Sequence, residues 1–355
     1  MDILQRKYKL YSSFILIGIV LCTILPTSCS CNCSSSDGIG GDWNPGGIGV
    51  KPTRIAFISD RDGVNDIYVM YNDGSEPGNV TEYDTDSNIH SLSWSPDGNR
   101  MAFVRYNRAR IVNINDKNGT TLGNNVVLRD YALSWSPDNN LIAFETDGEV
   151  HIRGVEPAFN SSFRPTNGDY HYPEWSPDGT KIALTYQLSG LLEIHVTDPD
   201  GSNEVNLTGY ALGNSYPKWS PDGSKIAYEC YGELMVMNSD GSSHTVLSID
   251  SGYWVEGSSI SWSPDGSKIV FETFNEPEDI YVIDSDGANL TNLTNNPNRD
   301  IRPCWSPYGT EIAFQSNRDG NWEIYVANLD GTRQTNVTNS QADDTYPVCC
   351  PLVPT

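Results

Sequence analysis

The chain has 355 residues, of which 37% are hydrophobic, so it is long and apolar enough to bury a sizeable core. Its formal net charge is -24. This acidity disfavours binding to DNA or RNA, because phosphate backbones attract clustered lysine and arginine, and it is explained most simply as a source of solubility.

The first fifty residues differ in kind from the rest. Arg6, Lys7 and Lys9 precede the apolar run FILIGIVLCTIL at 14–25, which is too short for an ordinary transmembrane helix and has the form of a signal peptide. Cys29 follows in the string PTSCSCNC, and this arrangement resembles a bacterial lipoprotein signal, except that Pro26 stands where that pattern has leucine. The resemblance implies a signal over 1–29 with lipid attachment at Cys29. Plain cleavage of a signal peptide is the alternative.

Residues 30–50 are rich in glycine and serine and predict a flexible tether ahead of a folded domain at 51–355. Four of the eight cysteines lie at 22–33, where a processing site explains them better than a metal clip. Export would permit disulfides among the others, and the sequence leaves open whether they form: Cys230, Cys304, Cys349 and Cys350.

The string Trp-Ser-Pro-Asp-Gly recurs along the folded domain. It or a close variant begins at residues 94, 135, 175, 219, 262 and 305. A single active site needs its acid once, so a string that returns with this period indicates architecture. Ser-Pro-Asp-Gly suits a type I turn position by position. Tyr308 replaces the aspartate in the last copy, so the carboxylate is dispensable there.

Two short apolar runs follow each turn. The first is of the type IAF, as in RIAF at 54 and EIAF at 311, and the second is of the type IYV, as at 67 and 324. Continuous short runs indicate strands that are buried on both faces. An x-D-G turn and a segment such as NVT or NLT complete the copy. Each copy therefore predicts four strands, in the order Trp, IAF, IYV and LT.

A lone four-stranded sheet would expose two apolar faces, and packing such sheets around an axis buries both, which predicts a β-propeller. The pattern W-S-P-D-G-x-x-I-A-F followed by I-Y-V-x-x-x-D-G resembles the TolB-like propeller repeat over residues 54–351. The resemblance implies an all-β fold of seven four-stranded antiparallel blades and a cell-envelope context. We do not carry over the specific partners of that family.

The two ends of the folded domain are halves of one repeat. The first copy begins at RIAF and has no Trp strand, while DDTYPVCCP at 343–351 matches RDIRPCWSP at 299–307, with Cys349 in the Trp position. We therefore expect the C-terminal segment to supply the inner strand of the first blade. Pairing of the N- and C-terminal segments would close the ring and leave no open sheet edge.

One end of the predicted ring carries the short turns, and the other carries long, variable connections. Turns that repeat are specified by folding, whereas loops that vary are free to suit a partner. Alignment of the copies on the Trp places the residues four and five positions before it at the mouth of the channel, on the end with the long connections. The neighbouring connections add tyrosine and tryptophan. We expect the following residues to contribute to partner binding: His90, Asp130, Tyr170, His171, Tyr172, Tyr216, Trp254, Asp300 and Asp344.

The aromatic and acidic character of these loops favours a basic or hydroxyl-rich partner, which we expect to be an envelope protein or a glycan. We expect a monomer that is exported to the periplasm or the cell surface, is attached to the membrane through its N-terminal lipid, and has no cofactor, metal or catalytic residue. The G-x-S-x-G, H-E-x-x-H, P-loop and G-x-G-x-x-G motifs are absent.

The alternative is a propeller enzyme that acts on carbohydrate. His90 and His171 occupy equivalent positions two blades apart, an arrangement similar to the oligogalacturonate lyases, which hold a metal through several histidines. Metal catalysis needs about three convergent ligands, and only two histidines share this position. An enzyme should show three or more clustered titratable groups in the channel. The acidic loops at 60 and 317 lack the calcium-loop spacing of EF-hands and predict hairpin turns.

Overall fold

The computed structural model describes residues 53–83, 88–122, 133–155, 159–209, 213–247 and 254–351. The chain divides into two units, residues 1–50 and 51–355, and the described residues all belong to the second. The predicted signal, the tether, Cys29 and Asp130 lie outside the described residues. Among the residues that are described, no helix has the length and apolar character needed to cross a membrane.

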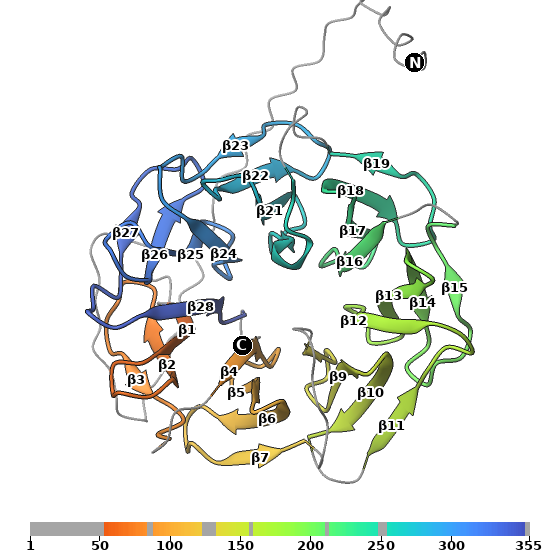
Figure 1. The fold of residues 1–355 in the computed structure, drawn as a ribbon, viewed down its shortest axis with the longest axis horizontal. Coiled ribbons are helices and arrows are strands. Elements are labelled where there is room, and N and C mark those ends of the chain that lie inside the picture. The colour runs from red at the N-terminus through yellow and green to blue at the C-terminus, as the bar shows by residue number, and fades with distance from the viewer. Residues whose placement is uncertain are drawn as a thin grey trace, which may run out of the picture. The chain divides into compact units, whose positions relative to one another are not determined.

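The described strands form seven four-stranded antiparallel sheets that stand in a ring, so the folded unit is a seven-bladed β-propeller, as the repeat predicts (Figure 1). Blade 1 contains β28 (Asp344–Cys349), β1 (Arg54–Ser59), β2 (Asp66–Tyr71) and β3 (Gly78–Asn79). Blade 2 contains β4 (Ile89–Trp94), β5 (Arg100–Arg105), β6 (Arg108–Asn113) and β7 (Gly119–Thr121). Blade 3 contains β8 (Ser134–Trp135), β9 (Leu141–Thr146), β10 (Glu149–Gly154) and β11 (Asn160–Phe163).

The remaining four blades follow in chain order. Blade 4 contains β12 (Asp169–Trp175), β13 (Ile182–Leu188), β14 (Leu191–Thr197) and β15 (Val205–Asn206). Blade 5 contains β16 (Asn214–Trp219), β17 (Lys225–Cys230), β18 (Glu233–Asn238) and β19 (Thr245–Val246). Blade 6 contains β20 (Ser261–Trp262), β21 (Lys268–Glu272), β22 (Ile280–Asp284) and β23 (Thr291–Asn292). Blade 7 contains β24 (Asp300–Trp305), β25 (Glu311–Ser316), β26 (Glu323–Asn328) and β27 (Thr335–Asn336).

The core lies between neighbouring blades, on both faces of the middle strands. Phe57, Phe144 and Phe314, the aromatic residues of three IAF runs, are 0% exposed. Trp94 of blade 2 packs in one cluster with Ile67 of blade 1 and with residues of its own blade. This confirms that the IAF and IYV runs are buried on both faces and that the repeated tryptophan fills the space between blades.

The tryptophans also join each blade to the preceding one through their indole N–H groups. Five of the six donate to the carbonyl oxygen of the residue just before the Trp position of the preceding blade. The bonds run from Trp94 to Val348, Trp135 to Ser93, Trp219 to Glu174, Trp262 to Lys218 and Trp305 to Ser261, at 2.9–3.3 Å. Trp175 departs from this pattern, because its indole nitrogen has no hydrogen-bond partner. The repeat thus fixes blade spacing by a polar contact as well as by packing.

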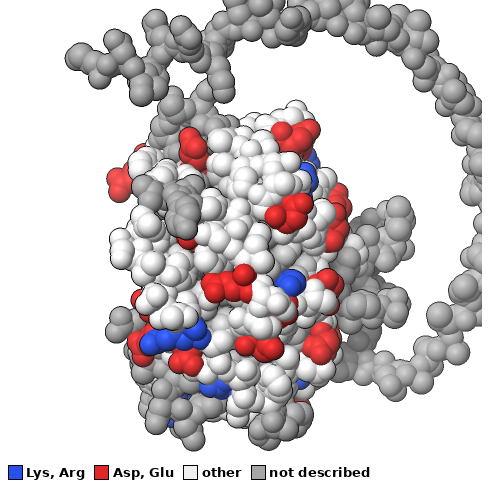
Figure 2. Space-filling model, turned by 90° about the vertical axis from the view of Figure 1, so that its right-hand side faces the viewer, with Lys and Arg blue, Asp and Glu red and all other residues white. Residues whose placement is uncertain are grey.

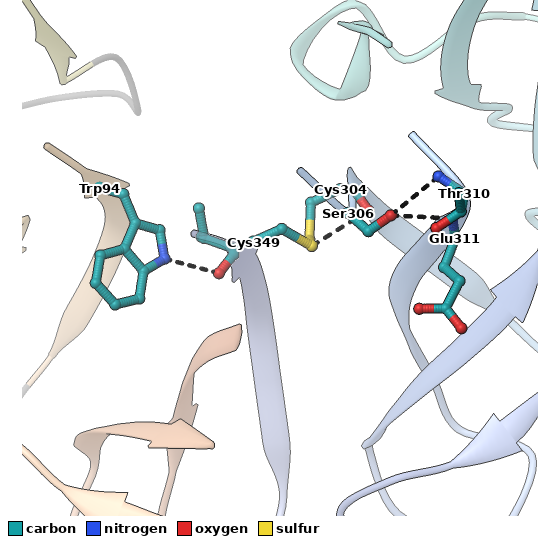
Figure 3. The surroundings of a disulfide bond; sticks show 7 residues. Trp94, Cys304, Ser306, Thr310, Glu311 and Cys349 are labelled. Carbon is teal, nitrogen blue, oxygen red and sulfur yellow. Dashed lines mark hydrogen bonds between the residues drawn. A yellow bond between two sulfur atoms is a disulfide. The ribbon is translucent and has the colours of Figure 1, made fainter. Parts of the chain in front are cut away.

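The C-terminal strand closes the ring as predicted. Strand β28 pairs antiparallel with β1, with Ile55 opposite Cys349 and Ser59 opposite Asp344. Cys349 occupies the Trp position of this last copy and forms a disulfide with Cys304 of β24, with 5.7 Å between the Cα atoms (Figure 3). Cys304 directly precedes Trp305, the place from which other blades offer a carbonyl to the next indole. A covalent bond therefore replaces the tryptophan contact at the seam.

The Ser-Pro-Asp-Gly turns are stabilised by hydrogen bonds among their own residues. The residue at the glycine position donates its N–H to the serine carbonyl at 2.8–3.0 Å in all six turns. In the turn at 220–223, Ser220 donates its hydroxyl to Asp222 at 2.6 Å, and Asp222 also accepts from the backbone of Ser224. The hydrogen bond from Ser220 is the main reason why the pKa of Asp222 is lowered to about 2. In the last turn, Ser306 accepts from both Thr310 and Glu311, which explains why Tyr308 is tolerated there (Figure 3).

The recurrent N-x-T strings, which have the form of glycosylation sites, have a structural use as well. Asn292 accepts the backbone N–H of Thr294 and donates its side-chain amide to Asp279 at 2.8 Å. The Thr294 hydroxyl donates to the same carboxylate and accepts from the backbone of Ile280. Such bonds tie the short outer strand to its blade. The amide nitrogen that would carry a glycan is therefore already engaged in the fold.

Candidate functional site

The strand order defines two ends of the ring. The short Ser-Pro-Asp-Gly and x-D-G turns lie at one end. Because the strands alternate in direction, the turns between second and third strands share the other end with the connections between blades. We call this second end the long-loop face. An axial cavity of about 790 Å³ between the blades is lined by residues of the inner strands β4, β12, β16, β20, β24 and β28. A cavity of this size can hold a small ligand or part of a larger one.

The inner strands share a bulge that sets which side chains enter the channel. The register between the first two strands shifts just before the Trp position in five blades. The residue three positions before the Trp then has a φ of 51–59° and lines the cavity. These residues are Ser91, Tyr172, Tyr216, Arg302 and Tyr346. Left-handed φ is costly for such residues, and the bulge with its repeated geometry points a variable side chain at the axis.

The bulge residues form two stacked pairs in the channel. The rings of Tyr172 and Tyr216 lie 4.1 Å apart, and the Tyr216 hydroxyl donates to that of Tyr172 at 3.0 Å. The guanidinium of Arg302 stacks over the ring of Tyr346 at 3.8 Å. Cation–π stacking of this kind holds a guanidinium plane in place. The sequence prediction included the two tyrosines of the first pair but missed Arg302 and Tyr346.

Carboxylates lie behind and beside these pairs. Glu272 accepts the backbone N–H of Arg302, and Glu174 forms an ion pair with Lys218 at 2.7 Å. Burial raises the pKa of Glu272 to about 7, although its hydrogen bond from Arg302 acts in the opposite direction. Glu256 also lines the cavity, and its charge raises the pKa of Glu272 further. The channel therefore brings together several titratable groups, one of which changes charge near neutral pH.

Three of the predicted docking residues are buried, so their side chains offer no exposed surface to a partner. Tyr170 is 2% exposed, and Asp300 and Asp344 are 0% exposed. Both carboxylate oxygens of Asp344 accept from a single guanidinium nitrogen of Arg61 at 2.9 Å, and Asp300 is held in the same way by Arg318. The two aspartates begin the inner strands as expected, but Arg61 and Arg318 cover them. Each arginine precedes Asp-Gly in the hairpin loop of the same blade. We leave these three residues out of the docking surface.

The two aligned histidines do not build a metal centre. His171 lies 3.6 Å from Glu145 and 3.0 Å from the side chain of Gln187, and its pKa is raised chiefly by the hydrogen bond to Glu145. His90 contacts Ser91 at 3.0 Å. In the part of the chain that the structure describes, no three or more His, Cys, Asp or Glu side chains are grouped so as to hold a metal ion. Asp130 lies outside the described residues.

An exposed aromatic cluster lies on the long-loop face of blades 5 and 6. Trp254, which the sequence predicted, is 60% exposed. Tyr231 between β17 and β18 is 58% exposed, and Phe274 between β21 and β22 is 59% exposed. The three are linked through the backbone, since Phe274 donates to the carbonyl of Trp254 and Val255 donates to that of Gly232. We call Tyr231, Trp254 and Phe274 the aromatic trio. Alignment on the repeated Trp missed two of them because they lie in hairpin turns.

The comparisons with known proteins agree with the repeat. Residues 254–352 match the family described as "TolB beta propeller domain". A protein named TolB homolog from Chlorobium luteolum is 30% identical over 151 residues, which are 41% of this chain and 34% of that protein. The chain thus spans about a third of the relative it matches. The protein is a propeller built from TolB-like repeats.

Solved structures with low sequence identity support the fold alone. The crystal structure of TolB from Acinetobacter baumannii matches with a TM-score of 0.54 and 17% identity, over 84% of this chain and 67% of that one. The oligogalacturonate lyase from Vibrio parahaemolyticus matches with a TM-score of 0.61 and 16% identity, over 77% of this chain and 85% of that one.

Proposed function

We propose that this protein is a non-catalytic binding propeller of the cell envelope that holds a protein or glycan partner against its long-loop face. The observation that carries the proposal is the difference between the two ends of the ring. The carboxylates of the short turns are engaged in hydrogen bonds within the turn, as Asp222 shows. The long-loop face instead groups three exposed aromatic side chains, Tyr231, Trp254 and Phe274. Exposed aromatic side chains grouped on a rigid scaffold are typical of binding surfaces. The predicted signal and Cys29 would place the propeller at a membrane.

Alanine substitutions at the two ends test this proposal. We expect Tyr172→Ala, Tyr216→Ala and Trp254→Ala together to abolish recovery of the partner from an envelope extract, because they remove aromatic contact area at the channel and the long-loop face. The matched set Asp178→Ala, Asp222→Ala and Asp265→Ala, at the short turns, should leave recovery unchanged. Melting curves show whether both variants are folded. If only the short-turn set abolishes recovery, the binding end has been assigned to the wrong side.

The enzyme alternative is favoured by one observation, the cluster of Glu256, Glu272 and Arg302 in the channel. A carboxyl group whose pKa is about 7 can give or take a proton at neutral pH, which is what a general acid or base requires. Incubation with oligogalacturonate and detection of an unsaturated product tests this alternative. A turnover that Glu272→Gln abolishes would favour the enzyme over the binding propeller.

Glu272 also gives a prediction that does not depend on activity. Its pKa is raised above the value of 4.5 for an exposed glutamate, so the folded state binds more protons than the unfolded state between about pH 4.5 and 7. We therefore expect its contribution to the free energy of unfolding to be full below pH 4.5 and to be lost as the pH rises to 7. Denaturant unfolding of wild type and Glu272→Gln across this range measures the difference. Equal pH slopes for the two proteins would contradict the raised pKa.

A further inference from the structure

The aromatic trio is held as a surface by the fold beneath it. Gly232 has a φ of 80°, and a Cβ atom built on it would lie 2.6 Å from the indole Cε3 of Trp254. The indole therefore packs directly over the backbone of the neighbouring hairpin at Gly232, the residue that follows Tyr231. The backbone of Trp254 is fixed on its other side, because its N–H donates to the Asn275 side chain at 2.9 Å. An exposed tryptophan that is anchored in this way loses little conformational entropy when a partner covers it.

The charged residues in the three segments that carry the trio are all acidic. The segments 230–233, 254–256 and 273–279 contain no lysine or arginine. Their acidic residues are Glu233, Glu256, Glu276, Glu278 and Asp279. Glu233 and Glu276 are exposed, while Glu278 is paired with Arg299 at 2.8 Å. On the side of the ring seen in Figure 2, acidic side chains are likewise spread over the surface with few basic ones between them. With a net charge of -24, the long-range field of the protein also attracts cations.

Resting on the proposed function, we infer that the aromatic trio and its glutamates bind a basic segment of a partner protein, in which arginine or lysine alternates with apolar side chains. The apolar side chains cover the exposed rings of the trio. The cations stack on the ring of Trp254 and pair with Glu233 and Glu276. A neutral glycan would satisfy the rings but would leave these carboxylates without a charged partner. A second copy of this acidic chain would bring like charges together.

Peptide binding tests the inference directly. The probe is a fluorescein-labelled peptide of alternating arginine and leucine, compared with the same peptide carrying glutamate in place of arginine, and binding is followed by fluorescence anisotropy. We expect the basic peptide to bind and the acidic peptide not to bind. Trp254→Ala and Phe274→Ala should each weaken binding of the basic peptide about tenfold. Glu233→Gln with Glu276→Gln should weaken it and reduce its dependence on salt.

Tyr308→Ala is the matched control, since Tyr308 is a 43% exposed aromatic residue in a short turn at the other end of the ring. Its binding should equal that of wild type. Equal binding of the basic peptide to wild type and to the Trp254 and Phe274 variants would overturn the inference, as would equal binding of the two peptides. The proposed function is tested separately by partner recovery with the long-loop set, which is Tyr172→Ala, Tyr216→Ala and Trp254→Ala together. If that set abolishes recovery while the peptide result is negative, the long-loop face binds a partner of another kind.

Discussion

Removal of residues 343–355 is expected to lower the melting temperature of the protein by about 10 °C or more, or to make it aggregate. The deletion removes β28, and with it the ladder to β1, the ion pair between Asp344 and Arg61 and the acceptor for the indole of Trp94. It leaves β1, an apolar strand, as an unpaired edge. Calorimetry of the purified protein measures the change.

Truncation after Pro351 is the control for this deletion. It shortens the chain but keeps β28 and the disulfide, so its melting temperature should equal that of the full chain. An unchanged melting curve after removal of 343–355 would mean that the ring does not depend on its C-terminal strand. The seven-bladed closure would then be wrong.

The second large effect concerns the bond between Cys304 and Cys349. The two cysteines are 45 residues apart in the sequence. A cross-link that closes a loop of this length lowers the conformational entropy of the unfolded chain and so raises the free energy of unfolding by about 4 kcal/mol. For a folded unit of this size, Cys304→Ser with Cys349→Ser should lower the melting temperature by about 6 °C under oxidising conditions. A reducing agent should lower the melting temperature of wild type by a similar amount and leave that of the double variant unchanged.

Two further variants locate the cause of this effect. Cys230→Ser removes a cysteine that is not in a disulfide and should behave as wild type. In Cys304→Ser with Cys349→Trp, the repeated indole is restored at the seam, so its N–H can donate to the carbonyl of residue 304. This variant should melt above the double serine variant. If it melts below the double serine variant, a tryptophan cannot take the place of the disulfide at the seam.

The repeat predicted the fold almost completely, because the strand patterns occur in the same order from copy to copy. The IAF and IYV runs, the two kinds of turn and the shared blade at the ends all lie where their period places them. The disulfide was left open because spacing alone does not pair cysteines. Only the equivalence of Cys349 with the repeated Trp, and the position of Cys304 before Trp305, brings the two together.

The candidate site was predictable only in part. Tyr172 and Tyr216, which the sequence placed in the long connections, line the channel. Alignment on the Trp cannot tell an exposed aspartate from a buried one. Asp300 and Asp344 are covered by arginines from their own hairpin loops, and that pairing depends on a contact across the blade. Tyr231 and Phe274 lie in turns that the alignment did not examine. Aromatic residues inside predicted hairpin turns were the available signal.

The central claim, that the long-loop face is the binding face, is tested most directly by photo-crosslinking in intact cells. A photoreactive amino acid is placed at position 254 on the long-loop face or at position 308 in a short turn. The account predicts a discrete crosslinked partner from position 254 and none from position 308, with a basic segment of the partner at the crosslink. A partner captured from position 308 alone would contradict it.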